Sequence, residues 1–189
     1  MENNEIKGTQ YNIDAVKINS SLKNGHLIIG PASIVFKKGL LTFLADLNAQ
    51  DELKLSTNIT AKDIDVGSIV KEITERVPVE GTANLFIDLN SQGRSPHELA
   101  SHLDGKVELI AENAIVLQRH IDLLLVDLVG WALTSTAKSL ERTSIDCTIV
   151  RFSIENGLLE SNALFATGPS IALGGKATID LSKETIDMI

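Results

Sequence analysis

Regular alternation of apolar and polar residues is the feature that most constrains the fold of this chain. In residues 81–90, GTANLFIDLN, alternate apolar residues face one way and polar residues the other, with Phe86 as the exception. The same pattern recurs at 41–49, 53–61, 107–111 and 170–181. Because successive side chains of a β-strand point to opposite faces, this pattern predicts antiparallel strands with one dry face and one wet face.

Turn residues separate the alternating runs. Asn24-Gly25 and Asn156-Gly157 are favoured two-residue hairpin turns, because both positions tolerate positive φ. The hairpins lie in similar stretches, SLKNGHL and SIENGLL, and a Gly-Pro pair follows each, which predicts one meander used twice. The final residues ETIDMI begin a strand equivalent to DELKLSTNITA. We therefore expect the sequence to stop short of the end of a longer parent protein.

Three helices are predicted between the strands. The first spans 65–77 and ends before Pro78, and the second is short and begins with the capping-box residues Ser95 and Glu98. The third spans 119–140 and is apolar over much of its circumference, so it must be buried against something. We expect this helix to cover the dry face of the sheet. The alternative is that it acts as a plug or contacts a partner protein or a membrane.

Together these elements predict a mainly β protein with helices, of the α+β class. Its expected architecture is a long curved antiparallel sheet, a β-groove meander, with three helices covering or capping it. We predict one domain at 11–189, truncated at its C-terminus, after a disordered or added tail at 1–10. The predicted order within it is a first meander at 11–62, the helix at 65–77, strands and a short helix at 79–112, the helix at 119–140 and a second meander at 143–189.

Composition and charge exclude several classes of function. The net charge of -8 and the pI near 5.0 argue against a nucleic-acid surface and against electrostatic docking on anionic head groups. The single cysteine, Cys147, excludes an internal disulfide. No signal peptide is visible, and the most apolar run, 121–133, is shorter than the roughly 20 residues that span a bilayer. The sequence predicts a soluble segment. The longer parent protein can still carry a membrane anchor outside this segment.

No catalytic or metal-binding motif stands out. His97 and His102 are five residues apart, which does not place them on one helix face. Asp63 and Asp65 resemble the start of a calcium loop, but the remaining ligands are out of register. Cys147 has no histidine near it in sequence and reads best as a small core residue. We therefore expect no enzyme activity, no cofactor and no metal, since a hydrolase would need a polar cluster in a pocket.

The dry face of the sheet is the strongest functional candidate. At ~25 cal/mol per Å², burying a contiguous apolar area of about 1,000 Å² contributes roughly 25 kcal/mol of free energy. Such an area is therefore not expected to stay exposed to water. Helices can cover it, which would make these residues an ordinary core; any uncovered remainder is a trough suited to acyl chains. The candidate lipid-facing residues are Leu85, Ile87, Leu89, Val107, Leu109, Ile171, Leu173, Ile179 and Leu181.

The stretch from VEGTANLFIDLN through SPHELASHLDGKVELIAENAIVL resembles the C-terminal region of the AsmA-like family of Gram-negative envelope proteins. The early NGHLIIGPASIVFKKGLLTFLADL and the late TSIDCTIVRFSIENGLLESNALFATG are similar to strands of the same family. The resemblance covers nearly all of 11–189. It implies a long periplasmic groove of repeated β units behind an N-terminal inner-membrane anchor, and a part in outer-membrane biogenesis. Several members are regarded as bridge-like carriers of phospholipid, and the resemblance implies no catalytic residues.

Our functional hypothesis is a non-enzymatic periplasmic module that shields or conducts phospholipid acyl chains along an apolar β-sheet groove. Its expected partners are phospholipid or another acyl-chain ligand, with envelope proteins as further partners and no nucleic acid. The expected location is the periplasmic region of an inner-membrane-anchored protein of a Gram-negative bacterium. The alternative is a protein-binding scaffold for outer-membrane assembly, which would bind through an unpaired strand edge or the apolar run at 121–133.

Overall fold

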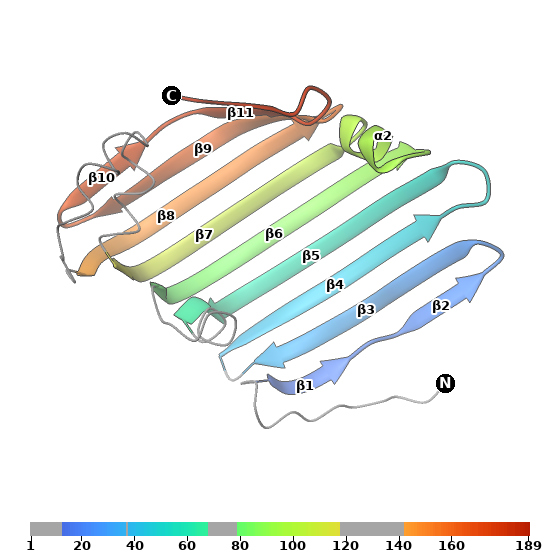
Figure 1. Ribbon diagram of the computed structural model, residues 1–189. Coiled ribbons are helices and arrows are strands. Elements are labelled where there is room, and N and C mark those ends of the chain that lie inside the picture. Colours follow the sequence, from blue (N-terminus) through green and yellow to red (C-terminus); the bar gives the residue numbers. More distant parts are fainter. Residues whose placement is uncertain (1–12, 37, 68–78, 118–141) are drawn as a thin grey trace.

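The computed structural model describes residues 13–36, 38–67, 79–117 and 142–189, and this part of the chain is dominated by one antiparallel sheet (Figure 1). The strand order is β1-β3-β4-β5-β6-β7-β8-β9-β11-β12, with β2 also paired to β3 and β10 to β9. Strands that follow one another in sequence mostly lie side by side, so the sheet is a long meander. No second sheet faces it within the described residues.

Seven of the twelve described strands have 10 to 15 residues, which is long by the standards of globular proteins, where five or six residues are usual. The first half of the sheet contains β1 (Ile13–Lys17), β2 (Ser20–Lys23), β3 (His26–Phe36), β4 (Gly39–Asn48), β5 (Leu53–Asp65) and β6 (Val79–Gly93). The helix α2 (Pro96–Ser101) follows. The second half contains β7 (Asp104–Leu117), β8 (Arg142–Glu155), β9 (Leu158–Gly168), β10 (Ile171–Gly174), β11 (Ala177–Asp180) and β12 (Thr185–Met188).

The α+β prediction is wrong, because the described part of the chain is nearly all antiparallel sheet and contains no helix of seven or more residues. Two strands extend beyond their predicted ends: β5 continues through Asp65, the first residue of the predicted helix at 65–77, and β7 continues through Leu117. Residues 66–67 are helical and follow Asp65 directly, so the helix-start signal at Asp65 agrees with the part of this segment that the structure describes. The predicted helix at 119–140 and most of the one at 65–77 lie outside the described residues.

Both predicted hairpin turns are present. Asn24 and Gly25 have φ of 49° and 76°, and Asn156 and Gly157 have φ of 49° and 73°. These left-handed pairs join β2 to β3 and β8 to β9, as a two-residue hairpin requires. The Gly-Pro pairs are not equivalent, however, because the first lies inside β3 and the second follows β9. The predicted final strand exists as β12, which pairs with β11.

The short predicted helix is confirmed as α2, and both residues of the predicted capping box form hydrogen bonds at its N-terminus. The Ser95 hydroxyl accepts a hydrogen bond from the Glu98 amide at 3.1 Å, and Glu98 Oε2 accepts one from the Arg94 amide at 2.7 Å. A Cβ at Gly93 would lie 2.7 Å from the Glu98 Cβ, so glycine there lets the helix approach β6. The buried Ser91 hydroxyl also donates to the Leu99 carbonyl oxygen at 2.5 Å. The helix is therefore tied to the end of β6.

Replacing Ser91 with alanine should loosen α2. The substitution leaves the Leu99 carbonyl without its buried donor, and the loss of such a hydrogen bond costs about 1 kcal/mol. We expect amide hydrogen exchange to quicken in α2 and to stay unchanged in β4. Equal protection of α2 in the wild type and in Ser91→Ala would show that this bond does not hold the helix.

The turn between β11 and β12 is organised by Asp180. Its carboxylate accepts hydrogen bonds from Lys183 Nζ at 2.6 Å, the Ser182 hydroxyl at 2.8 Å, and the Ser182 and Lys183 amides at 3.1 and 3.0 Å. The hydrogen bond from Lys183, followed by that from Ser182, holds the pKa of the Asp180 carboxyl well below its usual range. The charged form is therefore favoured in the folded state.

The Asp180 turn should make stability depend on pH at acid values. Because the folded pKa is lower than the unfolded value of about 3.9, the stabilisation is complete above that value and is lost as pH falls toward the folded pKa. We expect Asp180→Asn to lower the thermal midpoint at neutral pH and the difference from wild type to shrink below about pH 4. Melting curves of both proteins across this range would check it. A gap that is constant with pH would contradict this role.

Candidate functional site: the apolar face of the sheet

The strand register places apolar side chains on one face, here called the apolar face. Residues paired directly across neighbouring strands point to the same side of a sheet, so the pairings can be followed from strand to strand. One row across the sheet consists of Leu41, Ala61, Leu85, Leu109, Val150 and Leu164. The next row consists of Phe43, Ile59, Ile87, Val107 and Phe152. A third consists of Ile29, Ala45, Thr57, Leu89, Gly105, Ile154, Leu159, Ile179 and Ile186.

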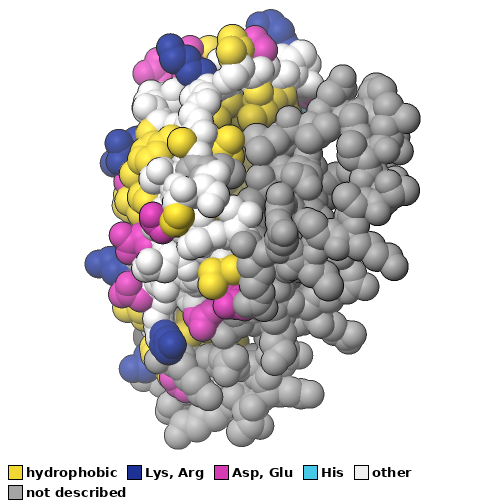
Figure 2. Space-filling view, turned by 90° about the vertical axis from the view of Figure 1, so that its left-hand side faces the viewer, with side chains coloured by type: hydrophobic (Ala, Val, Ile, Leu, Met, Phe, Trp, Pro, Cys, Tyr) yellow, Lys and Arg dark blue, Asp and Glu magenta, His cyan; other side chains and the backbone are white. Residues whose placement is uncertain are grey.

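The opposite, wet face carries the charged residues. Thr60, Phe86, Glu108 and Arg151 form one of its rows, which explains why Phe86 departs from the apolar alternation of its strand. Lys106 Nζ lies 4.9 Å from the centre of the Phe86 ring, which is within the range of a cation–π interaction. Seen from the side, basic and acidic side chains gather along one flank of the molecule (Figure 2). The two faces are therefore segregated by charge.

An ion pair joins β7 to β8 on the wet face. Arg151 donates two hydrogen bonds to the Glu108 carboxylate, at 2.8 and 3.1 Å. The hydrogen bond from Arg151 lowers the pKa of the Glu108 carboxyl, and Glu108 raises the pKa of the Arg151 guanidinium. Both groups therefore stay charged over the ordinary pH range, and an exposed pair of this kind adds little stability.

Most of the predicted lipid-facing residues meet on the apolar face. Leu85 pairs with Leu109 and Ile87 with Val107, and all four side chains are half-buried. Leu89, Leu173 and Ile179 share this face through their own pairings. Ile171 pairs with Gly168 at the start of β10. Leu181 lies outside the strands, in the turn after β11, where its amide donates to the Gly157 carbonyl oxygen.

The prediction missed apolar-face residues contributed by β4, β5 and β8. Phe43, Ile59 and Phe152 complete the row that contains Ile87 and Val107. The alternation at 41–49 and 53–61 already placed Phe43 and Ile59 on a dry face, so the signal was present in the sequence. It could not show that β4 pairs with β5 and β5 with β6, because pairing is a relation between distant residues.

The apolar face is not a conventional core. Within the described residues, no large side chain is less than 2% exposed, and the buried apolar residues are five alanines and three isoleucines. The alanines are Ala32, Ala61, Ala83, Ala114 and Ala177, and the isoleucines are Ile64, Ile145 and Ile154. A close-packed two-layer domain buries its larger apolar residues completely. The described residues therefore form one amphipathic layer.

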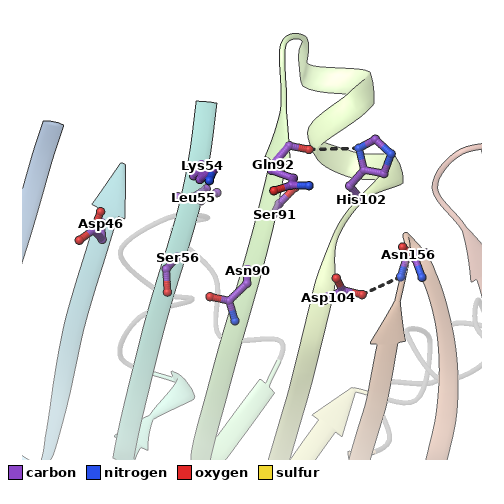
Figure 3. A pocket seen from close by; sticks show the side chains of 10 residues that line it. All are labelled: Asp46, Lys54, Leu55, Ser56, Asn90, Ser91, Gln92, His102, Asp104 and Asn156. Carbon is purple, nitrogen blue, oxygen red and sulfur yellow. Dashed lines mark hydrogen bonds between the residues drawn. The ribbon is translucent and has the colours of Figure 1, made fainter. Parts of the chain in front are cut away.

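A shallow hollow with a mainly polar lining lies at one end of the strands. Its residues come from the ends of β4, β5 and β6, from the α2 region and from the β8–β9 turn (Figure 3). The His102 ring nitrogen Nδ1 donates to the Gln92 carbonyl oxygen at 3.1 Å, and Asp104 Oδ1 accepts from the Asn156 amide at 2.8 Å (Figure 3). Asp46 Oδ1 lies 2.7 Å from His26 Nε2. These hydrogen bonds join neighbouring strand ends and turns.

No group of three or more His, Cys, Asp or Glu side chains is arranged to hold a metal ion among the residues that the structure describes. Over the same residues, no helix is long and apolar enough to cross a membrane.

The described part of the chain is a single meandering sheet with one apolar face and one charged face. This arrangement places the chain in the class of amphipathic β-sheet proteins. The model of the AsmA family matches residues 2–164, and the chain belongs to this family. Membership associates it with bacterial envelope proteins and with outer-membrane biogenesis. A search of curated proteins and a search of solved structures gave no match.

Proposed function

We propose that the chain is a non-enzymatic module that shields or conducts phospholipid acyl chains on its apolar face while the head groups stay in water. The observation that carries this proposal is the continuity of the apolar rows from β3 to β12. An acyl chain is a fitting occupant, because the face offers hydrocarbon and few hydrogen-bonding groups.

The dimensions of the apolar face support this occupant. Along β6 the apolar positions run from Ala83 to Leu89, which is about 20 Å at ~3.3 Å per residue. Across the sheet, ten strands on the pairing path span about 43 Å at ~4.8 Å per strand. One leaflet of a bilayer is about 15 Å deep in hydrocarbon, half of the ~30 Å core. The face is therefore large enough for an acyl chain in either direction.

Location and partners follow from the same proposal. The module would act in the periplasm of a Gram-negative bacterium, as part of an inner-membrane-anchored protein. Family membership supports an envelope location. The net charge of -8 does not favour tight electrostatic binding to anionic head groups, so capture would rest on the acyl chains.

Native mass spectrometry tests the proposal directly. The chain would be incubated with phosphatidylethanolamine vesicles, separated from them and sprayed from detergent-free buffer, before and after delipidation. We expect adducts with the mass of intact phospholipid, which delipidation removes and a second incubation restores. A protein that carries no phospholipid after incubation would rule out the acyl-chain role.

A protein-binding scaffold is the second candidate, favoured by an apolar row on the wet face. Ile110 pairs with Ile149 and Ile149 with Phe165, and the Phe165 residue is 39% exposed. Aromatic residues are enriched in protein interfaces. Photo-crosslinking in cells from Phe165 and from Ile87 would separate the candidates. Protein adducts from Phe165 without lipid adducts from Ile87 would favour the scaffold.

A further inference from the structure

The shallow hollow at one end of the strands contains hydrogen-bond donors without partners. Its volume is about 430 Å³, which is within the range of small-molecule sites. Lys54, Ser56 and Asn90 lie on the neighbouring strands β5 and β6 and line the hollow (Figure 3). Their exposed side chains make no hydrogen bond or ion pair with another residue that the structure describes. The hollow therefore offers a ligand one ammonium, one hydroxyl and one amide.

Two carboxylates flank these donors. One row across β4, β5, β6 and β7 consists of Asp46, Ser56, Asn90 and Asp104. The carboxylates stand at the two ends of this row, about 14 Å apart at the backbone at ~4.8 Å per strand. Asp46 Oδ1 lies 2.7 Å from His26 Nε2, whereas Asp104 uses Oδ1 to accept from a backbone amide at 2.8 Å. The Oδ2 atom of Asp104 is therefore left for a ligand.

This order of charges fits a zwitterionic phosphate ester. A phosphate diester is an anion, and it accepts hydrogen bonds from ammonium, hydroxyl and amide donors. In phosphoethanolamine an ammonium follows the phosphate after two methylene groups, which is about one strand spacing, the separation of Asp104 from Asn90. A head group that is only anionic fits less well, because the hollow holds two carboxylates against the single ammonium of Lys54.

The hollow is within reach of a lipid on the apolar face. Leu55 is among the residues that line the hollow, and its pairing with Leu47 continues the apolar positions of β4 and β5. Because β5 begins at Leu53, the end of the strand is about 7 Å from Leu55 at ~3.3 Å per residue. Within the described residues the sheet is a single layer at this end. A lipid whose acyl chains lie beside Leu55 can therefore place its head group around the strand end.

We propose that the hollow binds the phosphoethanolamine head group of a phospholipid whose acyl chains lie on the apolar face. Lys54, Ser56 and Asn90 donate to the phosphate, and the Asp104 carboxylate accepts from the ammonium. The hollow is shallow and mainly polar, so the head group stays in contact with water. This inference rests on the proposed function and adds to it a preference for phosphatidylethanolamine over anionic phospholipid.

Competition between two lipids tests the preference. The whole 189-residue chain would be incubated with vesicles of equal parts phosphatidylethanolamine and phosphatidylglycerol that carry the same acyl chains, and its adducts would be counted by native mass spectrometry. We expect phosphatidylethanolamine adducts to exceed phosphatidylglycerol adducts about fivefold, and Lys54→Met to lower phosphatidylethanolamine occupancy about fivefold. Lys62→Met is the matched control, because it removes the same charge from β5 outside the hollow. Equal binding of the two lipids, or equal losses in the two variants, would overturn this inference and leave acyl-chain binding standing.

Asp104→Asn tests the ammonium contact. The asparagine keeps an Oδ1 atom that can accept from the same backbone amide, but it removes the negative charge. We expect the ratio of phosphatidylethanolamine to phosphatidylglycerol adducts to fall about fivefold in this variant. A general folding defect would lower both kinds of adduct and leave their ratio unchanged. An unchanged ratio would therefore show that Asp104 does not bind the ammonium.

Glycerophosphoethanolamine, which is the head group without acyl chains, separates this inference from the proposed function. At millimolar concentration it should shift the NMR signals of the Asn90 side-chain amide in the wild type, and shift them less in Lys54→Met. These shifts in a protein that carries no phospholipid in mass spectrometry would contradict the acyl-chain role and support the hollow as a site for the free head group. If neither these shifts nor a preference for phosphatidylethanolamine is seen, the hollow is not a head-group site.

Discussion

Replacing Gly105 with alanine should destabilise the protein by about 3–5 kcal/mol, which is exceptional for the addition of one methyl group. Gly105 has φ of 140°, a conformation that residues with a Cβ rarely adopt. A Cβ there would overlap the Asp88 carbonyl oxygen of the neighbouring strand. Because Gly105 pairs with Leu89 and Ile154 in the middle of the sheet, relief requires β6 and β7 to separate locally.

Thermal unfolding checks this prediction. For a chain of this length the loss corresponds to a fall of about 10 °C in the melting midpoint. Gly174→Ala is the matched control, because a Cβ at Gly174 meets no atom within 4 Å. We expect the control to stay within about 0.5 kcal/mol of the wild type. Similar losses at the two glycines would contradict the close approach of the β6 backbone to Gly105.

Replacing Ile87 with asparagine should lower phospholipid occupancy about tenfold or more. Ile87 lies in the centre of the apolar face, between Ile59 and Val107. An amide left without a partner against hydrocarbon costs about 1–3 kcal/mol, and each 1.4 kcal/mol is a tenfold change in affinity. Native mass spectrometry after incubation with phosphatidylethanolamine vesicles gives the occupancy.

Asp88→Asn is the matched control for Ile87→Asn. It introduces the same side chain one residue further along β6, on the wet face, where Asp88 pairs with Lys106. We expect lipid occupancy to be unchanged in this variant. Ile87→Leu keeps an apolar side chain and should bind as the wild type does. Equal occupancy in Ile87→Asn and Asp88→Asn would contradict binding on the apolar face.

Local features of the fold could be predicted from sequence where they depend on neighbouring residues. The Ser95 and Glu98 caps of α2 and the left-handed Asn-Gly turns are set by atoms a few residues apart. The α+β prediction is wrong because local signals do not show how far strands such as β5 and β7 extend through pairing with their neighbours. Leu181 was placed on the apolar face by extending a period-two pattern beyond the strand, which ends at Asp180.

By itself, the sequence determined which side of each strand is dry, because alternation needs only a strand's own residues. Only the tertiary structure decided that Leu41, Leu85 and Leu164 belong to one row, since β4, β6 and β9 are joined through intervening partners. Register is a relation between distant residues.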